Sequence, residues 1–296
     1  MGTRPRPVAP CRFNSIKQYI EQRMGANAGS QVGVGDGIMP VDREDRGSIV
    51  WLTMNNPSRL NALSMPMRLE LIGHLRDIRA DQNVRCLVIT GAGTSFCAGA
   101  DISDSHGVRD YRSARHTIRN ASQVYIPLLT DLEIPVIAAV RGHAAGVGWS
   151  IALAADVIVA ADNAKFTSAF GRIGLAPDGG LVWHLMRAVG IYAAKDIVLR
   201  ARTIDATEAR SLGLVTQLVS QEELQDAVET IAKEYANGPT VATAMAKKQF
   251  HNAMFPPMSA FIEQEALMQP GLHTTEDSVE GPIAFREKRK PVFKGR

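Results

Sequence analysis

Leu87 to Ile102, LVITGAGTSFCAGADI, join an apolar strand directly to a loop of small residues. A second segment, Val136 to Ser150, VIAAVRGHAAGVGWS, repeats this arrangement and continues into a predicted helix. Loops of this kind bring bare backbone N–H groups close to a ligand, and a helix N-terminus favours negative charge. Because two such loops can give two donors to a single oxygen, the pair predicts an oxyanion hole rather than two unrelated turns.

The composition is that of an ordinary globular protein. The chain has 296 residues, of which 45% are hydrophobic, and a formal net charge of +3, so it can bury a large core. Basic residues are scattered except at the C-terminus, which argues against a nucleic-acid partner and leaves a short basic tail that could meet phosphates. The longest apolar runs are too short for a membrane span, and the N-terminus has no apolar segment like that of a secretory signal.

The cysteines bear on the compartment and on metal binding. The chain has three cysteines, Cys11, Cys86 and Cys97, and this odd number favours reduced thiols over disulfides. Their spacing is not that of zinc ligands, so the sequence shows no zinc-binding motif. We therefore expect a cytoplasmic protein without a metal. Cys97 flanks the first small-residue loop, and a small buried thiol is the better interpretation than a nucleophile, since no base is matched to it.

Composition divides the chain into three regions. Residues 1–46 are rich in Gly, Pro and Arg and are predicted to form a flexible N-terminal arm. A transit peptide would explain its basic residues. Its glycines and acidic residues instead favour an unstructured extension or an incorrectly assigned translation start. Residues 47–200 alternate strands with helices and are predicted to form the core, whereas residues 201–296 are predicted to form a C-terminal helical region.

Hydrophobic periodicity places the elements of the core. Strands are expected at Ile49–Met54, Cys86–Thr90, Val136–Val140 and Asp156–Ala160, with helices at Met65–Arg79, Asp110–Asn120 and Gly148–Ala154. Further helices are expected at Leu181–Val189, Ala193–Leu199, Ala206–Leu212, Glu222–Tyr235 and Val241–His251, with one strand at Leu214–Leu218. Alternation of this kind predicts a largely parallel α/β sheet. LVITGAG is similar to a dinucleotide-binding turn, but GAGTSF lacks the third glycine, which disfavours a Rossmann oxidoreductase.

Five segments together resemble the crotonase, or enoyl-CoA hydratase/isomerase, superfamily: NNPSRLNALS (residues 55–64), FCAGADIS (96–103), VRGHAAGVGWSIALAADVIVAA (140–161), FGRIGLAPDGG (170–180) and EGPIAFREKRKPVFKGR (280–296). The resemblance covers almost everything after residue 47. It implies a crotonase-like spiral of ββα units with a C-terminal helical trimerisation region, and an acyl-CoA thioester as the substrate. It also implies a homotrimer or homohexamer.

Matched position by position, the resemblance assigns candidate site residues. It puts the two oxyanion-hole amides at Ala100 and Val147, where main-chain donors with small neighbours can close on the thioester oxygen. It implies that the coenzyme A channel is lined by Ser58, Arg59, Leu60, Ala98, Asp101 and Ile102. Lys288 is implied to approach the phosphates of coenzyme A, although a solvated basic tail is an equally good explanation.

The chain departs from the hydratases of the family at two positions. Where those enzymes carry two glutamates that activate water, this chain has Ser150 and Phe170, and neither can act as a base. The remaining candidate is Asp178, which matches the aspartate of the 1,2-epoxyphenylacetyl-CoA isomerase and dienoyl-CoA isomerase branches, the former most closely. An N-cap role is the structural alternative, because Asp178 precedes a predicted helix. Phe170, Trp149 and Leu175 are expected to desolvate Asp178, and Phe170 with Trp149 to form an apolar acyl pocket.

These residues predict an acyl-CoA-processing enzyme that stabilises a thioester enolate and shifts a double bond, with Asp178 as its acid/base group. No metal and no cofactor are expected beyond the coenzyme A of the substrate. A hydratase, lyase, hydrolase or dehalogenase that uses Asp178 remains open, because an aspartate can also orient water or act as a nucleophile. A non-catalytic acyl-CoA-binding protein, in which loss of the glutamates marks lost chemistry, also remains open.

Overall fold

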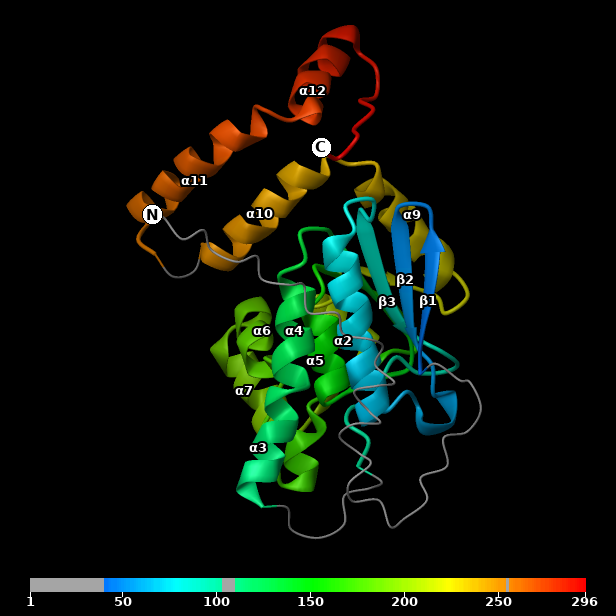
Figure 1. The fold of residues 1–296 in the computed structure, drawn as a ribbon. Helices are drawn as coiled ribbons and strands as arrows, with labels where there is room; N and C mark the ends of the chain where they lie inside the picture. Colours follow the sequence, from blue (N-terminus) through cyan, green and yellow to red (C-terminus); the bar gives the residue numbers. More distant parts are fainter. Residues whose placement is uncertain (1–39, 103–109, 254–255) are drawn as a thin grey trace, which may run out of the picture. The chain divides into compact units, whose positions relative to one another are not determined.

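The computed structural model describes residues 40–102, 110–253 and 256–296 (Figure 1). Their centre is a six-stranded sheet with the strand order β1-β2-β3-β4-β6-β9. The strands are β1 (Val41–Arg46), β2 (Ile49–Met54), β3 (Cys86–Gly91), β4 (Val136–Val140), β6 (Val157–Ala161) and β9 (Gln217–Val219). β1 is antiparallel to β2, and all the other neighbours are parallel, which confirms the predicted parallel core.

A smaller sheet of three short strands accompanies the first. β5 (His143–Ala145) is parallel to β7 (Lys165–Thr167), which is antiparallel to β8 (Thr203–Asp205). β4 is followed by β5 and helix α5 (Val147–Leu153), and β6 is followed by β7 and the 3-10 helix η2 (Ala169–Ile173). Each of these two turns therefore gives one strand to each sheet before a helical segment, as in the expected ββα spiral.

The remaining helical segments include all the other predicted helices. They are η1 (Pro57–Arg59), α2 (Met65–Ala80), α3 (Tyr111–Arg119), α4 (Ser122–Thr130), α6 (Leu181–Val189), α7 (Ile191–Leu199), α8 (Ala206–Ser211), α9 (Leu224–Ala236), α10 (Thr240–Asn252), α11 (Met258–Leu272) and α12 (Glu276–Glu287). Of these, η1, α4, α11 and α12 are not predicted from the sequence. α2 begins after Ser64, whose Oγ accepts a hydrogen bond from Met67 N at 3.4 Å, and Pro66 lies in its first turn, where a missing N–H costs nothing. No helix of the described ranges is long and apolar enough to cross a membrane.

The larger sheet is buried on both faces. Along β2, Val50 and Leu52 belong to one hydrophobic core, while Ile49 and Trp51 belong to the other. The first core includes residues of α2, α4 and α5, and the second includes one face of α9. A sheet covered on both sides explains why its strands are near-continuous apolar runs, which is the usual pattern for parallel strands.

One of the predicted region boundaries is wrong. The predicted flexible arm includes Val41–Arg46, yet these residues form β1. Their sequence, VDREDR, shows no apolar alternation because this edge strand exposes charged side chains. Four of these side chains form two ion pairs along the strand. Residues 1–39, the rest of the predicted arm, lie outside the described residues. Beyond residue 200, β8 and β9 pair with β7 and β6, so the predicted helical region also contributes to both sheets. The strand predicted at Leu214–Leu218 overlaps β9, whereas the three residues of β8 are too few for periodicity to reveal.

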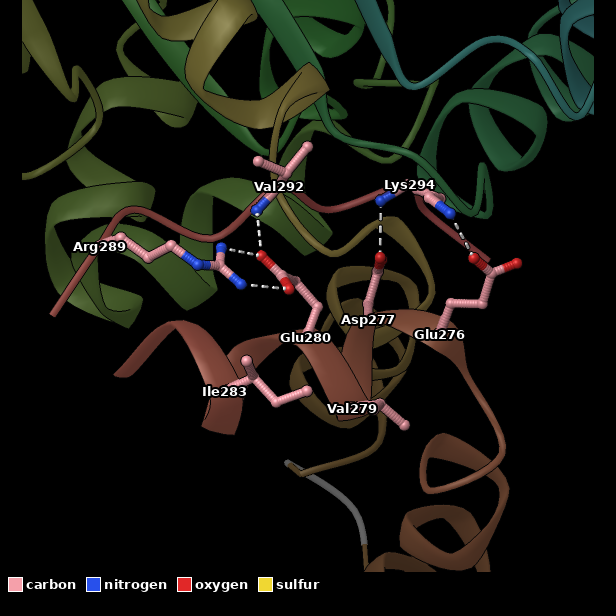
Figure 2. Close-up of a pocket in the computed structure, with 8 residues that line it drawn as sticks. All are labelled: Glu276, Asp277, Val279, Glu280, Ile283, Arg289, Val292 and Lys294. Carbon is pink, nitrogen blue, oxygen red and sulfur yellow. Dashed lines mark hydrogen bonds and ion pairs between the residues drawn. The ribbon is translucent and has the colours of Figure 1, made fainter. Parts of the chain in front are cut away.

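A pocket of ≈ 560 Å³ lies between α12 and the C-terminal tail (Figure 2). Three carboxylates line it, and each already has a partner within the chain. Glu280 accepts from Arg289 and from Val292 N, Asp277 accepts from Lys294 N at 2.6 Å, and Glu276 accepts from Lys294 Nζ at 2.8 Å. The hydrogen bond from Arg289 lowers the pKa of Glu280 to about 2. With its carboxylates engaged in this way, the pocket fastens the tail to α12 and offers no free base.

An ion pair fastens α10 to the larger sheet and gives a testable prediction. Lys247 Nζ lies 2.7 Å from Asp156 Oδ2 and donates to Ile134 O at 2.7 Å. Lys247→Met is expected to lower the free energy of unfolding by about 2 kcal/mol, because it leaves the largely buried carboxylate of Asp156 without its cation. The loss is smaller than for a fully buried pair because Asp156 retains some exposure. Denaturant unfolding checks this.

The adjacent lysine supplies the control. Lys248 Nζ pairs with Glu133 at the surface, where the two side chains are 46% and 65% exposed. Lys248→Met removes the same charge and is expected to change the free energy of unfolding by less than about 1 kcal/mol. Equal effects of the two substitutions would contradict the role given to Lys247.

Candidate active site

Asn61 holds the first glycine loop, which follows β3. Asn61 is fully buried and has a φ of 57°, a left-handed conformation that Asn tolerates better than most residues. Its side-chain amide donates to the carbonyl oxygens of Ala92 and Ser95 at 2.9 and 2.7 Å. The preceding residue, Leu60, accepts a hydrogen bond from Ala98 N at 2.9 Å. The glycine loop and the segment before α2 are therefore fixed to each other.

The two glycine loops lie against each other. Cys97 and Ala144 form an isolated parallel bridge, and Ala145 N donates to Cys97 O at 2.9 Å. A Cβ atom on Gly99, whose φ is 102°, would lie 2.8 Å from Ala145 O and 3.8 Å from Gly146 Cα. The backbones approach this closely because neither glycine carries a side chain. The structure thus brings together the two junctions that the sequence pairs.

The predicted oxyanion-hole amides belong to Ala100 and Val147, which follow these two glycines directly. Leu63 N donates to Gly99 O at 2.7 Å, and Leu63 O accepts from Asp101 N at 3.2 Å. These two hydrogen bonds flank Ala100 and do not use its N–H. Val147 is the first residue of α5, where an N–H has no partner within the helix. Neither N–H donates to any acceptor in the described part of the chain. Both are therefore available to a ligand oxygen.

Asp178 is not the cap of α6. The helix begins at Leu181 with Gly180 as its N-cap residue and has no side-chain cap, so the structural alternative for Asp178 is wrong. Ser150 on α5 donates from Oγ to the carbonyl oxygen of Asp178 at 3.0 Å. A Cβ atom on Gly179, whose φ is 60°, would lie 2.9 Å from Ser150 Cβ. The segment that carries Asp178 is thus closed against the helix that begins at the second glycine loop.

Asp178 is half-buried, and one oxygen of its carboxylate is an open acceptor. Its Oδ1 atom is inaccessible and has no hydrogen-bond partner among the described residues. Burial raises the pKa of Asp178 above its ordinary value, and the charge of Arg68 opposes this shift. Arg68 Nε also donates to Leu63 O at 3.0 Å, so one guanidinium acts on both Asp178 and the bridge to the first loop. A raised pKa and a free acceptor are the properties of a general base.

Two of the three expected apolar neighbours are buried. Trp149 is fully buried, and its ring centroid lies 5.9 Å from that of Phe166. Phe170 is buried too, and its Cζ lies 3.8 Å from the position that a Cβ atom on Gly146 would take. Leu175 is 60% exposed, so the expectation that it desolvates Asp178 is wrong. It follows η2 in a surface loop, whose position the local sequence does not reveal.

The residues expected to line the coenzyme A channel form two neighbouring segments. Ser58, Arg59 and Leu60, in η1 and at its C-cap, are exposed, while Ala98 and Asp101 are half-buried and Ile102 is exposed. Arg59 Nη1 lies 3.6 Å from Asp101 Oδ1 across the two segments. Lys288 is the C-cap residue of α12, and no hydrogen bond or ion pair between described residues joins it to either segment. A backbone hydrogen bond from Ala98 to Leu60 and the Arg59–Asp101 pair therefore join the two segments to each other, but not to Lys288.

Other titratable groups nearby have no reactive form at neutral pH. Burial raises the pKa of Cys97 to about 12, so the thiol stays protonated, and the expected buried thiol is confirmed. Burial, together with the charges of His251 and Arg187, lowers the pKa of His184 to about 4, so this imidazole is neutral.

The described residues contain no group of three or more His, Cys, Asp or Glu that could hold a metal ion.

Sequence motifs miss two residues that contribute to this site. Arg68 lies on α2 and its charge lowers the pKa of Asp178. Tyr125 lies on α4. Burial and the charge of Asp178 are among the causes that raise the pKa of Tyr125, while Arg68 lowers it. Neither residue has a local motif, and only the packing of α2 and α4 brings them to Asp178.

Comparison with known proteins agrees with this geometry. The family model for enoyl-CoA hydratase/isomerase matches residues 44–296. The chain belongs to this family, the crotonase superfamily. The ββα spiral is the crotonase fold. The structure superposes on the crystal structure of enoyl-CoA hydratase from Bacillus anthracis with a TM-score of 0.82. The two chains are 30% identical, and the superposition covers 87% of this chain and 100% of that one.

Two crotonase relatives have names that point to different reactions. The "Probable enoyl-CoA hydratase" of Rhodobacter capsulatus is 39% identical over 245 residues, which are 83% of this chain and 94% of the relative. The 1,2-epoxyphenylacetyl-CoA isomerase of Escherichia coli is 35% identical over 251 residues, which are 84% of this chain and 95% of the relative. Membership of the crotonase superfamily makes this chain an acyl-CoA enzyme, and the choice between hydration and isomerisation rests on its own residues.

Proposed function

We propose that this crotonase is a double-bond isomerase of enoyl-CoA or cyclic acyl-CoA thioesters, with Asp178 as its acid/base group. The observation that carries the proposal is the buried, unpartnered Oδ1 atom of Asp178, in a segment that Ser150 joins to α5. Ser150 and Phe170 stand at the positions of the two hydratase glutamates and offer no second base. A single base that removes a proton and returns it is sufficient for a double-bond shift.

In the proposed reaction, the thioester oxygen accepts hydrogen bonds from the N–H groups of Ala100 and Val147. The Asp178 carboxylate removes a proton from C2 of a 3-enoyl-CoA, and the electron pair moves into the thioester to give a dienolate. Protonated Asp178 then returns the proton to C4, which leaves a 2-enoyl-CoA and the ionised carboxylate. No water is consumed and no cofactor is required beyond the coenzyme A of the substrate. Trp149 and Phe170 provide apolar surroundings for the acyl chain.

Coenzyme A itself is assigned to the two neighbouring surface segments. In this proposal its binding residues are Ser58, Arg59, Leu60, Ala98, Asp101 and Ile102. Exposed backbone and side-chain groups on both segments, linked through Arg59 and Asp101, suit a long and partly polar ligand. Lys288 remains a candidate for contact with the phosphates, since its basic tail is exposed.

Proton exchange and double-bond migration in a 3-enoyl-CoA test the proposal, with hydration of a 2-enoyl-CoA followed in parallel. We expect the double bond to migrate without formation of a 3-hydroxyacyl-CoA. Deuterium from heavy water should enter C4 to the extent that protonated Asp178 exchanges with solvent before it returns the proton, and C2 only through reversal of the first step. Rapid hydration without migration would overturn the proposal and identify a hydratase. Binding of both substrates without any chemistry would favour a non-catalytic acyl-CoA-binding protein.

Hydration is the second candidate, because the relative from R. capsulatus is named for it. In that reaction Asp178 would take a proton from water, and another group would have to return a proton to carbon. Ser150 is a poor choice for this group, because its Oγ already donates to the carbonyl oxygen of Asp178. Isomerisation needs no second group, and we therefore favour it.

The pH dependence of the isomerase follows from the surroundings of Asp178. The reaction needs the ionised carboxylate, so kcat/KM should fall as the pH decreases through the raised pKa of Asp178, above the usual range of a carboxyl group. Arg68 lowers this pKa. Arg68→Met should therefore move the acidic limb of the profile to higher pH. A limb that stays in place, or moves to lower pH, would contradict the assignment of Asp178 as the base.

We also propose that the enzyme is a homotrimer or homohexamer of the cytoplasm that serves fatty acid metabolism. α11 has no buried residue, and its Met258, Ile262 and Leu267 are 77%, 49% and 75% exposed. Apolar surface of this extent favours association, and the resemblance implies a trimerisation region in this C-terminal part of the chain. Cys86 and Cys97 are free thiols, which suits a reducing compartment.

A further inference from the structure

Ser150 has a buried hydroxyl whose hydrogen bond leads to the residue assigned as the base. The side chain is fully buried on α5, and its Oγ donates to the carbonyl oxygen of Asp178 at 3.0 Å. The carbonyl oxygen of Gly146 lies 3.5 Å from the same Oγ, at the limit of hydrogen-bond length. Because a hydroxyl has a single hydrogen to donate, that hydrogen is directed to the nearer acceptor, Asp178.

Packing reinforces this hydrogen bond. A Cβ atom on Gly179, the residue after Asp178, would lie 2.9 Å from Ser150 Cβ and 3.1 Å from Val147 Cγ2. Gly179 therefore lies against the first turn of α5, which also carries the N–H of Val147 assigned to the thioester oxygen. The base and one oxyanion-hole donor are thus attached to the same short helix.

The chain around Asp178 depends on hydrogen bonds for its position. Gly179 and Gly180 follow with φ values of 60° and 74°, and two successive glycines have no side chains to restrict the backbone. The carbonyl oxygen of Asp178 accepts from Ser150 Oγ at 3.0 Å and from Leu181 N, on α6, at 3.2 Å. Of these two donors, Ser150 is the one that lies on the helix of Val147.

We propose that Ser150 is a positioning residue, which holds Asp178 in place relative to the oxyanion-hole donor of Val147 through its hydrogen bond to the Asp178 carbonyl oxygen. This inference rests on the proposed function, since it takes Asp178 as the base. The residue that stands at one hydratase glutamate position therefore serves the aspartate that remains. Proton transfer depends on such placement, because misplacing a reacting group by about 1 Å can lower a rate about 10²-fold.

Kinetics of Ser150→Ala on a 3-enoyl-CoA test the inference. We expect kcat to fall about tenfold, as a displacement smaller than about 1 Å would cause, while KM changes by no more than about twofold. Alanine keeps the Cβ atom that packs on Gly179 and removes only the hydroxyl. The variant should therefore fold, and its melting temperature checks this.

Ser122→Ala is the matched control. Ser122 is 3% exposed and lies on another helix, α4, so this substitution also removes a buried serine hydroxyl. It should leave kcat and KM unchanged.

A double-mutant cycle with Asp178→Asn shows whether Ser150 acts through the base. The carboxylate is already absent in that background, so Ser150→Ala should lower the residual kcat by no more than about twofold. A general loss of structure would instead lower kcat by the same factor in both backgrounds. Single-turnover kinetics measures the slow variants.

Three results would overturn the inference. The first is a Ser150→Ala variant that is as active as the wild type. The second is an equal loss of kcat in the two backgrounds, or an equal loss in Ser122→Ala, which would indicate a general effect of packing. The third is a rise of KM at unchanged kcat, which would make Ser150 a substrate-binding residue.

Failure of the proposed function is a separate result. A wild type that hydrates a 2-enoyl-CoA and moves no double bond would contradict only the isomerase, and the same cycle followed by hydration would then support or overturn the role of Ser150. A wild type with neither reaction would overturn both proposals, because Asp178 would not be a base.

Discussion

Asp178→Asn is expected to lower kcat for the isomerisation of a 3-enoyl-CoA about 10³-fold, the typical contribution of a general acid/base group. This corresponds to about 4 kcal/mol of transition-state stabilisation. The amide has nearly the same shape as the carboxylate but cannot accept the C2 proton. Because the residues assigned to coenzyme A lie on other segments, the affinity for acyl-CoA should change by no more than about twofold. Single-turnover kinetics and calorimetric titration measure the two quantities separately.

The stability of Asp178→Asn distinguishes lost chemistry from lost structure. Burial raises the pKa of Asp178, so at neutral pH the ionised carboxylate is less favourable in the folded protein than in the unfolded chain. A neutral amide avoids this penalty, and the variant should melt at a temperature no lower than that of the wild type. Asp226→Asn, in the exposed first turn of α9, is the matched control and should keep full activity. An active, well-folded Asp178→Asn would refute the single-carboxylate mechanism.

The fold could be predicted wherever the sequence pattern follows from burial. β2, β3, β4 and β6 are apolar runs because helices cover both faces of the sheet, and their positions were confirmed within one residue. β1 could not be found in this way, because its side chains are mostly charged and its pairing with β2 is made by the backbone. β8 and η2 are too short to show a period, and their conformation depends on neighbours far away in the sequence.

The site could be predicted only in part, for a related reason. The glycine loops show in the sequence, because a close backbone approach requires small residues at fixed positions. Asp178 showed through its match to a family position, and the structure removes its N-cap alternative. Arg68 and Tyr125 had no such signal, since the packing of α2 and α4 on distant loops brings them to Asp178. Leu175 was expected to shield Asp178 and does not, because the course of the loop after η2 is set by tertiary contacts.

Gly99→Ala is expected to lower kcat by about 10²- to 10³-fold, the usual effect of losing one oxyanion-hole donor. A Cβ atom at this position would lie 2.8 Å from Ala145 O, a backbone atom that cannot move without shifting the second loop. The substitution therefore separates the two loops and displaces the N–H of Ala100 from that of Val147. Steady-state kinetics on a 3-enoyl-CoA measures the loss, and the affinity for the coenzyme A portion should fall much less, because the assigned binding segments keep their surface groups.

The control must share the backbone strain of Gly99→Ala without its collision. Gly213 has a φ of 78°, and a Cβ atom there would have nothing within 4 Å, so Gly213→Ala adds a side chain at positive φ in open space. Each variant should lose about 1 kcal/mol or more of stability from the strained conformation, whereas only Gly99→Ala should lose kcat. Equal activity of the two variants would mean that the thioester oxygen does not depend on the contact between the loops. Loss of kcat in Gly99→Ala alone would tie catalysis to that contact, because strain is common to both variants and the displaced N–H is not.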